Sequence, residues 1–215
     1  MSKRTATATA NAYDHAKERL LDGRFAAGVL LSENELAREL GISRTPVREA
    51  FLLLEAEGLL ELYPRRGALV TPISPTESTD VLEARLLIEA HCAGAAAAPS
   101  PELAAVLADA IDRQERSLRE SDDGEVGHLF TVADRDFHET IVDFHGNPIL
   151  SHDYHALRDR QQRISATAVA RSRERIERFI AEHREIAAAL AAGDGPRARE
   201  LVTEHLIAAH ELARR

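Results

Sequence analysis

Apolar residues recur every three or four positions along most of this chain, which is the period of an amphipathic helix. Glycine and proline separate the periodic stretches, so the pattern predicts a series of short helices. Residues 1–10 show no such period, and we interpret them as a flexible tail. A first helix is predicted over residues 11–22, with Ala12, Ala16 and Leu20 on one side.

Two short helices and a hairpin are predicted next. Ser32 and Glu35 form a capping box at the start of the first helix, and a glycine ends it. The second helix begins near Ser43, and its apolar face has the spacing i, i+3, i+4, i+7: Val47, Ala50, Phe51 and Leu54. Segments 59–62 and 68–72 then predict two strands on either side of a basic Pro-Arg-Arg-Gly turn.

Six further helical segments follow a polar linker over residues 74–80. Proline and glycine breaks separate most of them, although no break marks the boundary between the fourth and the fifth. The segments cover residues 77–98, 101–120, 124–145, 148–170, 171–192 and 196–214. The sequence therefore predicts a mainly α protein, with a winged helix-turn-helix over residues 11–73 and an all-helical bundle over residues 81–215.

Composition narrows the class of protein. A single cysteine cannot form a disulfide within the chain, excludes a Cys-based zinc finger, and favours a reducing cytoplasm as the location. No stretch approaches the ~18 apolar residues of a membrane helix, so we expect no membrane partner. Residues 1–73 contain ten basic and ten acidic residues, so the whole net charge of -9 lies in residues 74–215. The two halves therefore differ in chemistry.

Basic side chains gather where a winged helix-turn-helix would meet DNA. The first turns of the second helix carry three candidates, away from its apolar face: Arg44, Thr45 and Arg48. A recognition helix places such residues against base edges in the major groove. Arg65 and Arg66 stand in the turn that Gly67 closes, where a wing reaches a phosphate or the minor groove. The alternative is a solvated surface on which the arginines pair with nearby acids: Glu39, Glu49 and Glu55.

The run SENELARELGISRTPVREAFLLLEAEGLLELYPRRGALVTPIS resembles the DNA-binding domain of the GntR superfamily, and SRTPVREA and PRRGA are typical of its FadR-like branch. The resemblance covers residues 12–73. It implies DNA contacts by the residues singled out above: Arg44, Thr45, Arg48, Arg65, Arg66 and Gly67. Two positions depart from the family pattern, since some members carry arginine in place of Asn34, and Ala27 replaces the usual proline before Gly28.

The acidic half places four polar side chains on faces that should be buried. Asp134 and His138 are four residues apart and share one helix face, a usual spacing for two metal ligands. His183 and His205 lie on the apolar stripes of two later helices. Burying such groups without partners costs about 1–3 kcal/mol each, which a shared divalent ion would offset. Imidazole and carboxylate suit Zn, Ni, Fe or Mn.

Each of these histidines has an ordinary alternative role. A single histidine on an apolar stripe is usually a core residue hydrogen-bonded to a backbone carbonyl, and this applies to His183 and to His205 taken alone. His145 lies one heptad after His138 and could compete with it as a ligand.

Arg85 is the candidate effector-binding residue. It shares a helix face with apolar residues that should turn it inward: Val81, Ile88 and Cys92. A buried guanidinium needs an anion, and a carboxylate matches its forked donors. The alternative is an ion pair within the chain, with an acid such as Glu89 or Asp134.

Three motifs of the second half resemble the all-helical FCD domain of the FadR-like branch: EARLLIEAHCAGAAA, DRDFHETIVDFHGNPIL and EHREIAAALAAGDGPRARELVTEHL. The resemblance covers residues 77–214. Metal-binding members use an Asp and three His, which correspond here to Asp134, His138, His183 and His205. Members that bind fatty acyl-CoA lack this set, so the chain does not resemble them. The resemblance implies a small organic acid as effector.

We therefore expect a DNA-binding transcription regulator and not an enzyme. A dimer is expected because palindromic operators need two-fold symmetry, and repression is the commoner family behaviour. Operator binding would respond to a small carboxylate bound at a divalent metal of the Zn, Ni or Mn class. One alternative is a metalloenzyme, although no general base or nucleophile accompanies the four ligands at a recognisable spacing. The other is a DNA-binding regulator whose metal is purely structural or absent.

Overall fold

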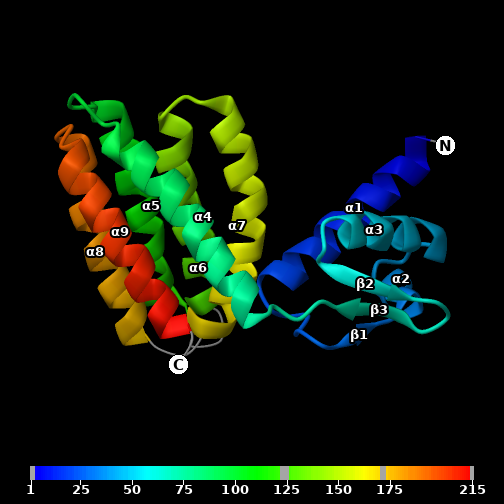
Figure 1. The fold of residues 1–215 in the computed structure, drawn as a ribbon. Helices are drawn as coiled ribbons and strands as arrows, with labels where there is room; N and C mark the ends of the chain where they lie inside the picture. Colours follow the sequence, from blue (N-terminus) through cyan, green and yellow to red (C-terminus); the bar gives the residue numbers. More distant parts are fainter. Residues whose placement is uncertain (1–2, 122–125, 170–172, 214–215) are drawn as a thin grey trace. The chain divides into compact units, whose positions relative to one another are not determined.

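The computed structural model describes residues 3–121, 126–169 and 173–213 of this 215-residue chain. The chain forms two compact units, Met1–Ser74 and Pro75–Arg215 (Figure 1). Helices dominate the described residues, which confirms the predicted mainly α class. None of the helices in these ranges is long and apolar enough to cross a membrane.

The first unit is a winged helix-turn-helix. Its small antiparallel sheet has the strand order β1-β3-β2, so that Leu30 and Glu61 lie on opposite sides of Leu69. The predicted helices and hairpin strands are present, and β1 is an additional strand too short to show a period. The elements are α1 (Lys3–Leu21), β1 (Leu30–Leu31), α2 (Glu33–Glu39), α3 (Arg44–Ala56), β2 (Leu60–Tyr63) and β3 (Gly67–Val70).

Helix α1 is longer than its sequence suggests. It begins at Lys3, so residues 3–10 are helical, and the prediction of a flexible tail over residues 1–10 is wrong for these positions. Thr9 is buried, and its hydroxyl donates a hydrogen bond of 2.7 Å to Glu49 Oε2 on α3. Packing against α3 therefore holds in a helix a segment that has no apolar period of its own.

Packing also fixes which side of α3 faces solvent. Ser32 caps α2 as predicted, since its Oγ accepts a hydrogen bond of 3.4 Å from the Glu35 backbone N–H. The predicted apolar face of α3 is fully enclosed, with these side chains 0% exposed: Val47, Ala50, Phe51 and Leu54. The opposite face, which carries Arg44 and Arg48, is exposed.

The second unit is a helical bundle. Helix α4 packs against α6, α7 and α9, and α5 packs against α6 and α8 (Figure 1). The helices are α4 (Pro75–Gly94), α5 (Pro101–Glu120), α6 (Val126–Phe144), α7 (Pro148–Val169), α8 (Arg173–Ala191) and α9 (Gly195–Ala213). All six predicted segments are present. The predicted boundary at 170/171 and the predicted start at 124 lie outside the described residues.

Both ends of α4 differ from the prediction. The helix begins at Pro75, so the linker predicted over residues 74–80 is helical from its second residue onward, and the second unit begins before residue 81. Proline is tolerated in a first turn, where its missing N–H is not needed. The helix ends at Gly94, four residues earlier than predicted, and Pro99 follows; helices usually end at or before the residue that precedes a proline. The second unit and helix α4 therefore begin at the same residue, Pro75.

Polar and charged side chains are buried within the bundle beside its apolar core. Folded proteins bury such groups only with partners, since an unpaired one costs free energy. Their contacts therefore define the candidate site. Those that matter below are all less than 10% exposed: Arg85, Glu89, Gln114, His138, Arg158, His183 and His205.

Candidate metal centre and nucleic-acid interface

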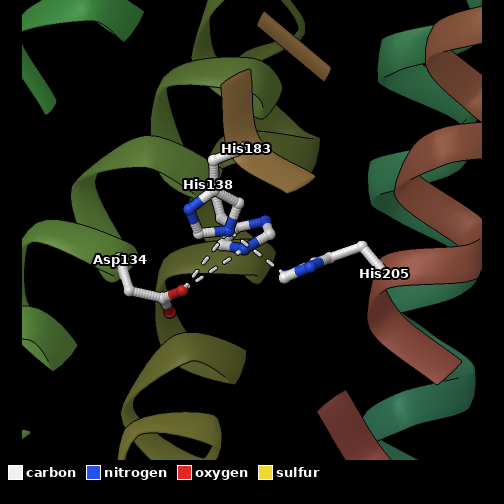
Figure 2. Close-up of side chains that lie close together, drawn as sticks. All are labelled: Asp134, His138, His183 and His205. Atoms are coloured by element: carbon white, nitrogen blue, oxygen red, sulfur yellow. Dashed lines mark hydrogen bonds and ion pairs between the residues drawn. The ribbon is translucent and has the colours of Figure 1, made fainter. Parts of the chain in front are cut away.

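Three helices of the bundle direct four polar side chains to one point, as Figure 2 shows. Asp134 and His138 come from successive turns of α6, while His183 comes from α8 and His205 from α9. Each offers a nitrogen or carboxylate oxygen, and these four atoms all lie within 4.8 Å of one another. The structure thus brings together the whole predicted set. His145, the possible competitor, instead packs its ring against His91 with centroids 5.2 Å apart.

Each of the three histidines is held by an oxygen on the far side of its ring. The Nδ1 contacts are His138 with Glu89 Oε2 at 2.6 Å, His183 with Gln114 Oε1 at 2.8 Å, and His205 with Glu182 Oε2 at 2.7 Å. Carboxylate and amide oxygens accept hydrogen bonds, so in the neutral rings the hydrogen is on Nδ1. The lone pair of each Nε2 therefore points to the common centre, which is the arrangement of metal-ligating histidines.

At the centre, ring nitrogens and a carboxylate oxygen that could each bind a metal face one another, and none of them carries a hydrogen. The Nε2 atoms of His183 and His205 are 3.3 Å apart, and Asp134 Oδ1 lies 3.6 Å from His138 Nε2 and 3.7 Å from His183 Nε2. His138 Nε2 is buried and has no hydrogen-bond partner among the described residues. Opposed lone pairs and a carboxylate oxygen repel one another unless a cation lies between them. These residues therefore fit a divalent ion.

Burial and charge set the protonation of these groups. Burial lowers the pKa of His183 well below its usual value, and the neighbouring imidazoles lower it further. Burial also lowers the pKa of His205. Burial raises the pKa of Asp134, but its interactions with His138 and with the Arg158 guanidinium outweigh burial and hold that pKa well below the usual range. Neutral imidazoles and an ionised carboxylate are the forms that bind a metal.

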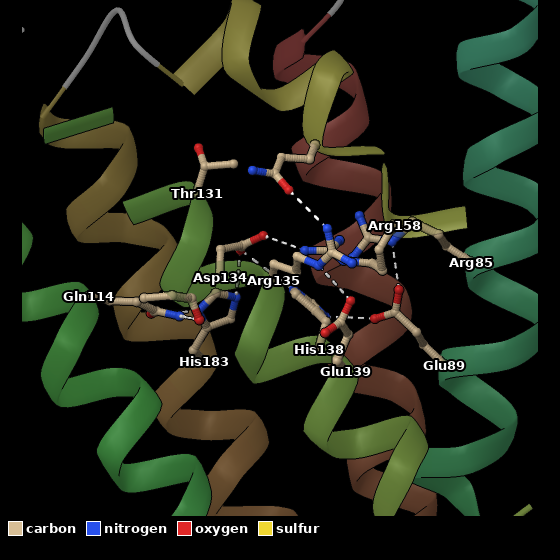
Figure 3. Close-up of polar contacts among 12 residues, drawn as sticks. Arg85, Glu89, Gln114, Thr131, Asp134, Arg135, His138, Glu139, Arg158 and His183 are labelled. Carbon is tan, nitrogen blue, oxygen red and sulfur yellow. Dashed lines mark hydrogen bonds and ion pairs between the residues drawn. The ribbon is translucent and has the colours of Figure 1, made fainter. Parts of the chain in front are cut away.

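A buried charge network surrounds the centre (Figure 3). Glu89 is 0% exposed and accepts hydrogen bonds of 2.6 Å from Arg85 Nε and from the Tyr154 hydroxyl. Burial raises the pKa of Glu89, but Arg85 and His138 outweigh it and keep the carboxylate ionised. Arg158 donates to Asp134 Oδ2 at 3.1 Å, which leaves Oδ1 directed to the centre.

One of the two contacts expected for Arg85 is present in the structure. Its Nε is paired with Glu89, as in the alternative of an ion pair within the chain. Its Nη2, however, is buried and finds no hydrogen-bond partner in the described part of the chain. The side chain also lines a cavity beside the centre, together with Asp134, His138 and His205. Its volume of about 40 Å³ is room for a few water molecules.

The roles of several residues in this network do not follow from the sequence pattern alone. Glu89 is four residues after Arg85, so this pair was visible as an alternative, but its contact with His138 was not. Gln114, Glu182 and Arg158 are polar residues on helices whose mutual register the sequence does not give. A polar residue on an otherwise apolar stripe was the available sign for Gln114, which lies on the buried face of α5.

In the first unit, a groove runs between α2, α3 and the wing. Its volume is about 410 Å³. Five of the six predicted DNA-contacting residues line it: Arg44, Arg48, Arg65, Arg66 and Gly67. Thr45 is exposed in the first turn of α3 and is not among the lining residues. The groove thus contains four arginines and one acid, Glu33, which contacts Arg44 at 3.0 Å.

The acids weighed as partners of these arginines make other contacts. Glu39 pairs with Arg19, while Glu49 accepts from Thr9 and Glu55 accepts from a backbone N–H of the wing. Gly67 has a φ of 118°, and a Cβ there would lie 2.2 Å from the Leu31 carbonyl oxygen. Glycine at this position therefore lets the wing strand pair closely with β1.

Two family models match the chain in sequence order. The model described as bacterial regulatory proteins of the gntR family covers residues 8–70, and the FCD domain model covers residues 80–208. The chain belongs to the GntR family. Its first unit is the GntR helix-turn-helix domain and its second unit is the FCD domain.

GntR-family relatives are transcription regulators. An HTH-type transcriptional regulator of Streptomyces ambofaciens is 33% identical over 90% of this chain and 80% of its own length. A Paenarthrobacter nicotinovorans protein, named "Probable D-xylose utilization operon transcriptional repressor", is 31% identical over 88% of this chain and 81% of its own. The gluconate operon transcriptional repressor of Bacillus licheniformis is 34% identical over 58% of this chain and 49% of its own.

Solved structures share the fold of this GntR-family chain. The E. coli McbR/YncC structure superposes with a TM-score of 0.82, covering 100% of this chain and 98% of the other at 22% identity. Lar of Listeria monocytogenes gives a TM-score of 0.65, covering 96% of both chains at 21% identity. At this identity the likeness concerns the arrangement of the helices and strands.

Proposed function

We propose that this GntR-family regulator is a dimeric repressor whose operator binding responds to a small organic acid bound at a divalent metal. The observation that carries the proposal is the convergence of three imidazole Nε2 atoms and Asp134 Oδ1, with every Nδ1 held from behind. A histidine in an ordinary core role uses one ring nitrogen for a hydrogen bond. Its second ring nitrogen does not face the ring nitrogens of other histidines.

Asp134, His138, His183 and His205 would hold the metal. Their nitrogen and oxygen donors suit an ion of the Zn, Ni or Mn class. Such an ion supplies open coordination positions that a carboxylate can fill. The four residues fix the position of the ion because each is itself held, the imidazoles by their Nδ1 contacts and Asp134 by Arg158.

The effector would lie in the cavity beside the centre. Arg85 Nη2 is a buried donor in need of an acceptor, and the Arg85 side chain lines this cavity with three of the four ligand residues. A carboxylate satisfies a guanidinium through charge-assisted hydrogen bonds. The small volume favours a compact acid.

The groove of the first unit would bind operator DNA. Arg44 and Arg48 stand on the exposed side of α3 for the major groove, and Arg65 and Arg66 stand in the wing for phosphate or the minor groove. One such reader covers one half-site, so a two-fold dimer is needed for a palindromic operator. The effector changes DNA affinity only if it binds the two arrangements of the dimer unequally, and the effect is reciprocal.

The test is the metal content of the untagged protein, measured by elemental analysis. We expect about one ion per chain in the wild type and none in His183→Ala, because that variant loses a central ligand. His145→Ala is the matched control, since it removes a histidine outside the centre, and it should keep the ion. A wild type without metal, or a His183→Ala variant with its metal intact, contradicts the assignment.

A second measurement separates a sensing metal from a structural one. DNA affinity is titrated with small carboxylates in the metal-loaded and the chelated protein. A shift that needs both metal and Arg85 supports the proposal. If neither the acids nor the metal changes the DNA affinity, the protein is a DNA-binding regulator whose metal is only structural. Consumption of an acid would instead indicate a metalloenzyme.

A further inference from the structure

The two oxygens of Glu89 have different partners. Oε1 accepts hydrogen bonds from Arg85 Nε and from the Tyr154 hydroxyl, and Oε2 contacts His138 Nδ1, each at 2.6 Å. The side chain is 0% exposed, so water does not compete for either oxygen. Figure 3 shows Glu89 between Arg85 and His138. One carboxylate therefore joins the arginine assigned to the effector and the histidine assigned to the metal.

We propose that Glu89 is a positioning residue that selects the tautomer of His138. An ionised carboxylate only accepts, so it favours the hydrogen on Nδ1 and leaves the Nε2 lone pair for the metal. The opposite tautomer would turn the Nδ1 lone pair toward a negative oxygen. This inference rests on the proposed metal site, but the tautomer is a property of the metal-free protein and can be measured by itself.

Arg85 decides how the side-chain amide is oriented in a Glu89→Gln variant. Arg85 Nε carries a hydrogen and can only donate, so the group at the Oε1 position must be an acceptor. In Glu89→Gln the amide oxygen therefore takes the Oε1 position, and the amide NH₂ takes the Oε2 position. That NH₂ faces His138 Nδ1, which then has to accept. The ring hydrogen then moves to Nε2, the atom that would bind the metal.

Removal of Arg85 should restore the original tautomer in the Glu89→Gln background. With Arg85 also replaced by methionine, nothing that only donates faces the Oε1 position, because the Tyr154 hydroxyl can donate or accept. The amide is then free to turn its oxygen toward His138 Nδ1 and restore the original tautomer. A residue that merely fills space would not give back a histidine tautomer when its other neighbour is removed.

The experiment is ¹⁵N NMR of histidine-labelled, metal-free full-length protein, which distinguishes Nδ1–H from Nε2–H rings. We expect His138 to be Nδ1–H in the wild type, Nε2–H in Glu89→Gln, and Nδ1–H again in the Glu89→Gln/Arg85→Met variant. Tyr154→Phe is the matched control, since it removes one contact of Glu89 and leaves Arg85 on Oε1. It should keep the wild-type tautomer.

Zn²⁺ affinity, measured by competition with a chelating dye, is the second readout. Losing an outer partner of a metal-ligating histidine lowers metal affinity about 10–100-fold, and we expect this for Glu89→Gln with partial recovery in the double variant. Circular dichroism shows whether each variant is folded.

Two outcomes overturn the inference. One is an Nε2–H ring for His138 in the wild type, a measurement that needs no variant. The other is a folded Glu89→Gln variant with an Nδ1–H ring and unchanged Zn²⁺ affinity. A wild type that binds no Zn²⁺ but shows the expected tautomers contradicts the proposed metal site and leaves the role of Glu89 in place.

Discussion

His183 and His205 face each other through their Nε2 atoms, 3.3 Å apart, while their Nδ1 atoms contact Gln114 and Glu182 on opposite sides. Both outer contacts call for a hydrogen on Nδ1, so two lone pairs meet in the middle. With both lone pairs in place, these rings would repel each other, and a cation between them would remove that repulsion. If a metal binds here, its removal should therefore affect the stability of the bundle.

Metal removal should lower the stability of the second unit. An ion that binds only the folded state at 100 times its Kd adds about 2.7 kcal/mol to the free energy of unfolding. We expect a lower melting temperature after chelation and recovery on adding Zn²⁺, measured by calorimetry. His145→Ala should respond to chelation as the wild type does. If neither chelation nor added Zn²⁺ changes the melting temperature, the rings of His183 and His205 do not need a metal between them.

Arg158→Met should lower the free energy of unfolding mainly when no metal is present. Arg158 is 1% exposed and donates to Asp134, whose side chain is 15% exposed. Its loss leaves this largely buried carboxylate without its cation, which should lower the free energy of unfolding by about 3–5 kcal/mol. A bound divalent ion supplies the missing charge, so the deficit should shrink when Zn²⁺ is present. Denaturant unfolding with and without Zn²⁺ measures both values. Arg135→Met, which affects the ion pairs with Glu139 and Asp159, is the control and should show no such dependence on metal.

Arg48→Ala should weaken specific operator binding by about 1–3 kcal/mol, because an arginine that forks onto a base loses both hydrogen bonds. Fluorescence anisotropy with specific and scrambled duplexes at several salt concentrations separates this loss from a change in phosphate contacts. Arg24→Ala removes an arginine of the same unit that pairs with Glu18 and Asp22 outside the groove. It should bind as the wild type does, and equal losses in both variants would count against the assignment.

Gly67→Ala should lower the stability of the first unit more than Gly28→Ala does. Both glycines have positive φ, 118° and 81°, but only at Gly67 would a Cβ meet backbone, at 2.2 Å from the Leu31 oxygen. We expect a cost of about 1–2 kcal/mol at Gly28 from backbone strain alone, and about 3 kcal/mol or more at Gly67. Thermal unfolding measures both. Equal costs would mean that β1 moves away from the wing without penalty.

The sequence was informative where one helix carries the whole signal. The apolar face of α3 and the pair Asp134 and His138 depend on spacing within a single helix, which the 3.6-residue period fixes. Glu89 and Arg158 depend on the register between helices, which apolar side chains of similar size leave open. Their roles therefore needed the structure.

Boundaries were less predictable for a related reason. Residues 3–10 have no apolar period, yet they are helical, and Thr9 among them finds a hydrogen-bond partner on α3, 40 residues further along the chain. Residues 95–98 have the best helix formers, yet the following proline ends the helix early. In both places a contact or a steric rule from outside the segment outweighed its own propensity.

Helix α4 has a mechanical consequence. Pro75, the first residue of the second unit, and Glu89 lie in one helix of 20 residues, about 21 Å apart along its axis. Each degree by which α4 tilts about Glu89 displaces Pro75 by roughly 0.4 Å. A tilt that pivots at this buried carboxylate would make the helix act as a lever. A tilt of a few degrees deep in the bundle would then displace by more than an ångström the peptide bond at which the DNA-binding unit of the chain ends.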